Sequence, residues 1–195
     1  MARADDPVVA EFVGAFEGEA VDVAVHETST VGEAHAAVRG AVERGVDAIA
    51  AVGGDGALSL VFATVADERS EIPVVPVRAG TVNLMAQVLD LPTPSLAARS
   101  VLDGATAAID LGETQHGWFC LNTSTGFDAA TIGDADDHSD ARFGRLRFAL
   151  AGLQRLRSHA PRRVAVNVDG DDVHVGRAMS VVVMNAGQRV TDRFD

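Results

Sequence analysis

The chain has 195 residues, a length that suits one domain or two small ones and that can bury a hydrophobic core. It carries 28 acidic residues against 16 basic ones, all of them Arg, and the net charge of −12 opposes binding to the phosphate backbone of nucleic acids. A single cysteine, Cys120, excludes an intramolecular disulfide, and no apolar run approaches the roughly 18 residues that cross a bilayer.

The same composition indicates a protein of the cytoplasm. An acidic surface without Lys is of the halophile type, in which salt screens the charge; genomic base bias that replaces Lys by Arg is the alternative explanation. One cysteine is compatible with a reducing compartment, and the chain does not begin with a signal peptide pattern. We therefore expect a cytoplasmic protein.

Strand and helix patterns alternate over the first hundred residues. Helices are expected at 8–16, 34–44, 58–67, 84–89 and 95–102, the second after the capping box Thr30-Val31-Gly32-Glu33 and the last capped by Ser95. Strands are expected at 20–26, where Val21, Val23 and Val25 share a face, at 47–52 and at 72–77. This alternation predicts an α/β domain with a mostly parallel sheet that binds ligands at the carboxyl ends of its strands.

The pattern changes after about Leu111. Strands are expected at 118–122, 164–169 and 179–185, with antiparallel turns at Asp169-Gly170 and Ala186-Gly187. One amphipathic helix is expected at 142–158, and seven of the 16 Arg residues fall between Arg142 and Arg163. We therefore expect two domains, an α/β domain at 1–112 and an incomplete β-rich domain of sandwich type at 113–195.

The most informative stretch is Gly53-Gly54-Asp55-Gly56, which separates a strand pattern from a helical one. Its glycines permit positive φ and let backbone N–H groups converge where no Cβ blocks a ligand, and the helix adds the positive end of its dipole. This context predicts a phosphate-binding loop; a tight turn with nothing bound is the alternative. A second turn, Gly80-Thr81-Val82-Asn83, follows the next strand, so both turns are expected at one edge of the sheet.

These paired turns resemble those of the diacylglycerol kinase catalytic domain family, which includes lipid kinases and sphingosine kinases and is distantly related to NAD kinase. Leu121-Asn122, Gly126-Phe127-Asp128-Ala129 and Arg142-Phe143-Gly144-Arg145-Leu146 are also similar to the family's pattern. The resemblance implies an NAD kinase-like first domain that binds ATP with Mg²⁺ and transfers its γ-phosphoryl group to a lipid hydroxyl. It places the nucleotide contacts at Thr28, Gly53, Gly54, Asp55, Gly56, Ala57, Leu58, Ser59, Gly80, Thr81 and Asn83.

Asp55 has a further role in this hypothesis, because a carboxylate beside a triphosphate is repelled unless a cation lies between them. It is therefore the candidate Mg²⁺ ligand, and the candidate catalytic residue if it assists deprotonation of the acceptor hydroxyl. The alternative is that Asp55 accepts hydrogen bonds from backbone amides and holds the turn. Asn83 is open in the same way between nucleotide contact and helix capping.

Some positions depart from the family pattern. Ala57 stands where the family usually has Thr, and Leu84 where many members have Asp. The family's first strand, its later acid/base residue and its structural metal site are not matched, so we expect a fragment truncated at both ends, a misassigned reading frame or a degenerate member. NAD kinase is one alternative function, disfavoured because Asn122 is followed by Thr123 where NAD kinases have Glu. A non-catalytic nucleotide-binding module is the other.

The expected partners are ATP and a lipid acceptor, with a homodimer left open. The arginines between Arg142 and Arg163 suit anionic headgroups and a peripheral place at a membrane surface; a solvated helix face paired with Asp136, Asp137 and Asp140 is the alternative. Six His residues are scattered without ligand spacing, so no zinc site is expected.

Overall fold

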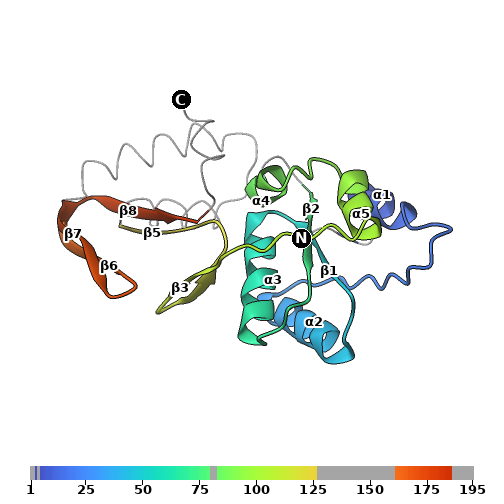
Figure 1. Ribbon diagram of the computed structural model, residues 1–195, viewed down its shortest axis with the longest axis horizontal. Coiled ribbons are helices and arrows are strands. Elements are labelled where there is room, and N and C mark those ends of the chain that lie inside the picture. The colour runs from blue at the N-terminus through green and yellow to red at the C-terminus, as the bar shows by residue number, and fades with distance from the viewer. Residues whose placement is uncertain (1–2, 4, 80–82, 127–160, 186–195) are drawn as a thin grey trace. The chain divides into compact units, whose positions relative to one another are not determined.

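The computed structural model describes residues 3, 5–79, 83–126 and 161–185 (Figure 1). The chain divides into two units, one that runs to Leu121 and takes in Asn185, and one that spans Asn122–Met184. The elements of the first unit are α1 (Pro7–Gly14), α2 (Val31–Arg44), β1 (Ile49–Gly53), α3 (Asp55–Asp67), β2 (Val74–Arg78), α4 (Leu84–Val88), α5 (Pro94–Leu102), β3 (Gly112–Thr114) and β4 (Gly117–Phe119). The sequence-based domain boundary near residue 112 stays a prediction.

The centre of the first unit is a parallel pair of strands, β1 and β2, in register from Ile49 opposite Val74 to Gly53 opposite Arg78. Figure 1 shows this pair between α3 on one side and α1 with α5 on the other. Successive strand residues point to opposite faces, so Ala51 packs toward α3 and α4 while Val52 packs toward α1 and α5. The predicted α/β class is confirmed.

Each face of the β1–β2 pair carries its own hydrophobic core. The buried residues of the first core are Ala51, Leu58, Met85, Cys120 and Leu121. Those of the second core are Phe12, Phe16, Val75, Val77, Ala97 and Ala98, with the two Phe rings edge to face at 5.3 Å between centroids. The apolar strands thus bury both of their faces, as helix-covered parallel strands do.

Local sequence signals account for most of the helix ends. The predicted capping box at α2 is present, with Thr30 and Glu33 each accepting from the other's backbone N–H, and α2 ends at Gly45 with φ 64°. Helix α5 corrects the prediction that Ser95 is its cap. It begins at Pro94 after the cap Thr93, whose hydroxyl accepts from Leu96 N, because proline suits the first helical position and Ser95 follows it.

The strand predicted at 20–26 is wrong, because residues 21–28 form no strand. Val21 and Val25 are 40% and 48% exposed, and of the three aligned valines Val23 alone packs against the second core. A strand needs a hydrogen-bonded neighbour, and in the described part of the chain β1 pairs with β2 alone. The alternation of Val21, Val23 and Val25 therefore belongs to a segment without strand pairing, in which Val23 alone packs against a core.

The second unit consists of antiparallel pairs in the residues that the structure describes. Its elements are β5 (Asn122–Gly126), β6 (Arg162–Val168), β7 (Asp171–Ala178) and β8 (Ser180–Met184), which pair as β5–β8 and β6–β7. The predicted hairpin turn at Asp169-Gly170 is confirmed, and both residues take positive φ, 54° and 92°. The strand predicted at 118–122 is instead split into β4 and β5 around Cys120 and Leu121. The predicted helix at 142–158 and turn at 186–187 lie outside the described residues.

Candidate functional site

The predicted phosphate loop is the junction between β1 and α3. Gly53 ends the strand, Asp55 begins the helix, and Gly54 between them has φ −86° and ψ −178°. None of Gly53, Gly54 and Gly56 uses the positive φ that glycine permits. Among the described residues, a Cβ added at Gly54 or Gly56 would meet nothing within 4 Å, and no side chain caps α3. The first backbone N–H groups of α3 therefore lie beside open space, where an anion can accept from them.

Gly53 is required for a different reason. It is buried, and a Cβ added there would lie 2.9 Å from the Cβ of Ala57. Glycine at position 53 lets the first turn of α3 lie directly against the end of β1.

The two turns are joined by hydrogen bonds. Asn83 Nδ2 donates to the Gly53 carbonyl oxygen at 3.0 Å, and the amide of Leu84 donates to Asp55 Oδ1 at 2.8 Å. The parallel register, which sets Gly53 opposite Arg78, explains why the segments that follow the two strands meet. Gly80 and Thr81 of the second turn lie outside the described residues.

Asp55 accepts hydrogen bonds from backbone amides, which is one of the roles considered for it, although the amides belong to α4 and not to its own turn. Its Oδ1 accepts from Leu84 N at 2.8 Å and from Met85 N at 3.4 Å, so the carboxylate holds the first turn of α4. Both hydrogen bonds described for this carboxylate end on Oδ1. No group of three or more His, Cys, Asp or Glu that could hold a metal occurs in the described ranges. One carboxylate oxygen nevertheless fits Mg²⁺, which usually takes its other ligands from phosphates and water.

Asn83 is the N-cap of α4, where its Oδ1 accepts from Ala86 N at 3.0 Å. Its side chain is fully buried, with 0% exposure. Leu58 is also buried, at 1% exposure, and packs in the first core, so only its backbone can reach a ligand at the loop. Thr28 and Ser59 are both half-buried, Thr28 in the extended segment before α2 and Ser59 in α3.

Cys120 lies next to the loop, a proximity that sequence reasoning missed. The side chain is buried, with 2% exposure. Burial raises the pKa of the thiol above its ordinary value of 9.0, the Ser59 hydroxyl opposes this by hydrogen bonding, and the charge of Asp55 adds to it. The thiol therefore stays protonated and packs as a small apolar group beneath the first turns of α3.

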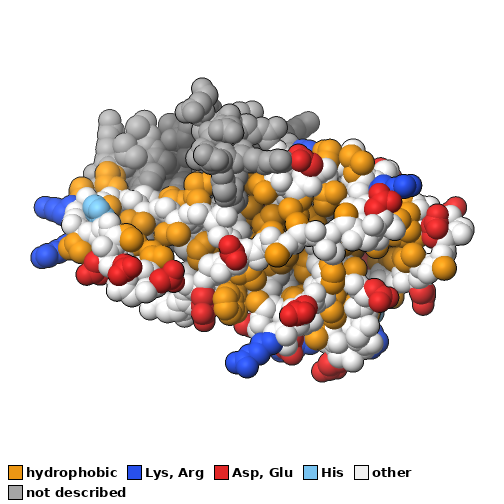
Figure 2. All heavy atoms as spheres, in the orientation of Figure 1, with side chains coloured by type: hydrophobic (Ala, Val, Ile, Leu, Met, Phe, Trp, Pro, Cys, Tyr) orange, Lys and Arg blue, Asp and Glu red, His pale blue; other side chains and the backbone are white. Residues whose placement is uncertain are grey.

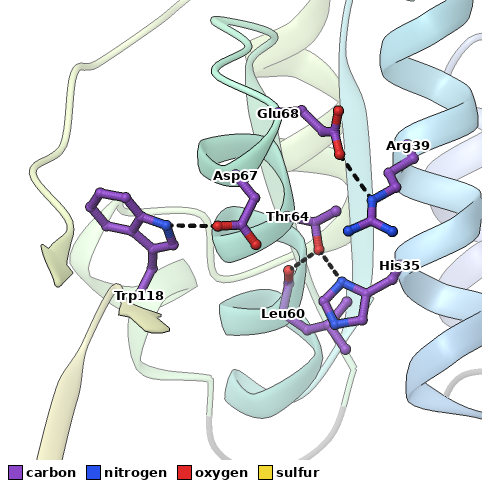
Figure 3. Close-up of polar contacts among 7 residues, drawn as sticks. All are labelled: His35, Arg39, Leu60, Thr64, Asp67, Glu68 and Trp118. Atoms are coloured by element: carbon purple, nitrogen blue, oxygen red, sulfur yellow. Dashed lines mark hydrogen bonds and ion pairs between the residues drawn. The ribbon is translucent and has the colours of Figure 1, made fainter. Parts of the chain in front are cut away.

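Helix α3, which presents the loop, is fixed along its length by polar contacts that Figure 3 shows. Thr64 is fully buried, and its hydroxyl donates to Leu60 O at 2.7 Å and lies 2.7 Å from His35 Nδ1 of α2. Because Thr64 uses its one hydroxyl proton toward Leu60 O, His35 Nδ1 is the donor in the second bond. One turn further along, Arg39 pairs with Glu68 at 2.9 Å. On another side, Trp118 Nε1 donates to Asp67 Oδ1 at 2.9 Å. The helix is thus held to α2 and to β4.

The negative charge is unevenly distributed along the chain. Residues 1–121 contain 18 acidic residues and six Arg, whereas residues 122–195 contain ten of each. Acidic side chains are spread over much of the described surface on the face drawn in Figure 2. The unit that holds the loop thus carries the whole net charge, so an anionic ligand must be held by local N–H groups against a repulsive field.

Comparison with known proteins decides the family. The sequence model of the diacylglycerol kinase catalytic domain matches residues 3–114. The chain belongs to this family. The model of the YegS C-terminal NAD kinase β-sandwich-like domain matches residues 122–189, in agreement with the β-rich second unit.

Curated relatives of this family carry lipid-kinase names. Diacylglycerol kinase of Bacillus subtilis (strain 168) is 30% identical over 166 residues, which cover 83% of this chain and 54% of the relative. Diacylglycerol kinase of Mycobacterium tuberculosis (strain ATCC 25618 / H37Rv) is 35% identical over 151 residues, 72% of this chain and 48% of the relative. A probable lipid kinase YegS-like of Stenotrophomonas maltophilia is 31% identical over 169 residues, which cover 82% of this chain and 54% of the relative. The chain spans about half the length of these relatives.

A solved structure supports the fold. A putative diacylglycerol kinase from Bacillus anthracis str. Sterne superposes with a TM-score of 0.65 at 20% identity, covering 91% of this chain and 59% of that one. The NAD kinase-like architecture with a β-rich second part is therefore confirmed. Among the described residues, no helix is both long enough and apolar enough to cross a membrane.

Proposed function

We propose that this chain binds ATP with Mg²⁺ at the β1–α3 loop, as part of an enzyme that transfers the γ-phosphoryl group to a lipid hydroxyl. The observation that carries the proposal is the open space beside Gly54 and Gly56 at the uncapped start of α3, next to the Asp55 carboxylate. Phosphoryl transfer is catalysed mainly by positioning and charge neutralisation, and this loop offers the means for both. The lipid acceptor is inferred from the names of the relatives.

The residues of the loop take separate roles in this proposal. The N–H groups of Gly54 and of the first turn of α3 hold phosphate oxygens, with hydroxyl groups from Thr28, Ser59 and Thr81 as further donors. Asp55 Oδ2 holds Mg²⁺, which when bound neutralises phosphate charge. As the carboxylate of the loop, Asp55 is also our candidate for assisting removal of the proton from the acceptor hydroxyl.

We propose that the second unit contributes to contact with a membrane surface from the cytoplasmic side. Arg163 and Arg177 lie directly opposite each other on β6 and β7. Within the described ranges the ion pairs are Arg3–Asp5, Arg39–Glu68 and Arg99–Asp103, so neither Arg163 nor Arg177 has a carboxylate partner there, and Arg177 donates to the carbonyl of Pro161. Exposed cations facing each other favour an anionic counterpart, and anionic lipid headgroups supply one.

Nucleotide binding is tested by thermal unfolding with and without Mg-ATP. Saturating a site to about 100 times its Kd adds roughly 2.7 kcal/mol to the free energy of unfolding, and each kcal/mol raises Tm by about 2–4 °C for a chain of this size. Gly54→Val should fold, because its φ suits any residue and its Cβ meets no neighbour, but should lose the rise in Tm.

Gly32→Val is the matched control, since a Cβ at Gly32 in α2 also meets nothing within 4 Å. It should retain the full rise in Tm. Absence of a rise in the wild-type protein, or an equal rise in Gly54→Val, would remove the nucleotide site from the loop.

Transfer itself is tested with radiolabelled ATP and either diacylglycerol in vesicles or NAD as acceptor. Label in the lipid supports the proposal, whereas label in NAD would replace it with NAD kinase. Because the chain spans about half the length of its relatives, the same assay is run on a chain extended to their length. Binding of ATP without transfer to either acceptor in the extended chain would leave a nucleotide-binding module.

A further inference from the structure

We infer that Asn83 is a positioning residue for the β1–α3 loop, which acts by bridging the Gly53 carbonyl and the first turn of α4. The nucleotide that the loop would hold rests on the proposed function, but the bridge itself does not. The inference assigns Asn83 to the loop's geometry in place of the direct nucleotide contact that its motif suggests.

Burial is the first support. The Asn83 side chain has 0% exposure, so a ligand cannot reach it without a rearrangement of its surroundings. Its Nδ2 donates to Gly53 O at 3.0 Å and its Oδ1 accepts from Ala86 N at 3.0 Å. Both ends of the carboxamide are therefore engaged by backbone groups, one from each turn.

Peptide planarity transmits the effect of this bridge. The Gly53 carbonyl and the Gly54 N–H belong to the same planar trans peptide, so holding one fixes the direction of the other. A peptide flanked by two glycines rotates with little steric resistance unless something holds it. The Gly53 carbonyl accepts from Asn83 and also from Ala79 N at 3.4 Å, and these two donors hold that peptide. Asn83 thereby aims the Gly54 N–H, the first donor beside the open space.

Helix α4 extends the same unit to Asp55. Asn83 satisfies the N–H of Ala86, while Asp55 Oδ1 satisfies those of Leu84 and Met85. A five-residue helix depends strongly on such caps, because most of its N–H groups have no partner within the helix. Loosening Asn83 therefore also loosens the first turn of α4, to which Asp55 Oδ1 is anchored.

Asn83→Asp separates the bridge from the cap. The aspartate keeps the size of the side chain and the oxygen that accepts from Ala86 N, but it has no N–H₂ to donate to Gly53 O. Asn83→Ser is the second variant, an uncharged helix cap whose side chain is too short to bridge the two turns. Thr93→Ala is the control, because it removes the cap of α5 and should destabilise the protein without touching the loop.

The first measurement is ¹⁵N relaxation of the ligand-free protein. We expect the order parameter of the Gly54 amide to fall from a rigid value near 0.85 toward about 0.6 in Asn83→Asp and Asn83→Ser, and to stay unchanged in Thr93→Ala. Direct nucleotide contact by Asn83 predicts no change at Gly54 without ligand. An unchanged Gly54 order parameter in both Asn83 variants overturns the inference.

The second measurement is the Kd for Mg-ATP by calorimetry. Loss of one well-placed donor weakens binding by roughly tenfold, so both Asn83 variants should bind about ten times more weakly and Thr93→Ala as wild type. Affinity unchanged in the Asn83 variants would also overturn the inference. A wild-type protein that binds no Mg-ATP would refute the proposed function alone, since the relaxation result stands without ligand.

Discussion

The close approach of β1 and α3 makes a quantitative prediction about Gly53→Ala. The new Cβ would lie 2.9 Å from the Ala57 Cβ, well inside the 3.5–4.0 Å at which carbon atoms make favourable contact. Neither atom belongs to a flexible side chain, so the end of the strand or the first turn of the helix must move. Overpacking of this kind costs about 1–3 kcal/mol, and we expect a loss of free energy of unfolding in that range.

Urea unfolding followed by Trp118 fluorescence measures this loss. Trp118 is the single tryptophan of the chain, and its indole is hydrogen-bonded to Asp67 at the end of α3, so its emission reports on the helix that is displaced. The midpoint should fall with little change in the slope, because the surface exposed on unfolding is nearly the same.

The matched variants are Ala57→Gly and the double variant Gly53→Ala/Ala57→Gly. Ala57→Gly alone should cost up to about 1 kcal/mol through helix propensity. In the double variant the two side chains are exchanged and the overlap disappears, so its loss should be smaller than the sum of the two single losses by about 1–2 kcal/mol. Additive losses would refute the reasoning, because they would show that the two positions do not collide.

Three further outcomes follow from the first unit. Thr64→Val removes the hydroxyl that bonds His35 and Leu60, and should lower the free energy of unfolding by about 1–3 kcal/mol in urea; a loss below 0.5 kcal/mol would contradict that network. Burial raises the Cys120 pKa, so the folded chain keeps the thiol proton to higher pH: the resulting stability is complete below the unfolded pKa near 9.0 and is lost as pH rises toward the folded pKa. Cys120→Ala should therefore lose less stability than wild type between pH 8 and 11, and parallel curves would contradict the shift. Because the first unit carries the net charge, Mg-ATP should bind more tightly as KCl rises from 50 to 500 mM, and weaker binding would show that the local field is positive.

Features that depend on neighbouring residues in the chain were predictable from the sequence. The capping box at Thr30 and Glu33, the turn at Asp169-Gly170 and the glycine junction at Gly53 each arise from a few consecutive residues. The signal for the true cap of α5 was also present, since Pro94 favours the first helical position after Thr93.

Features that depend on distant residues could not be predicted. Apolar alternation at 20–26 does not say whether a neighbouring strand is available, and the described chain offers none. The bridge from Asn83 to Gly53 joins residues 30 positions apart, and the thiol of Cys120 reaches Ser59 across an even longer separation. The first contact forms only when β1 and β2 have paired, and the second only when the segment after β4 has packed against α3.

The hydrogen bond from Asn185 N to Leu121 O, at 2.7 Å, bears on whether the second unit can be deleted from the chain. Asn185 also donates through Nδ2 to the carbonyls of Asp110 and Cys120, so the chain re-enters the first unit next to where it left. Residues 122–184 are thus an insertion into the first unit, and the two ends of the insertion leave that unit at adjacent residues. A short turn that joins Leu121 to Asn185 would replace the second unit and would retain every residue of both hydrophobic cores of the first unit.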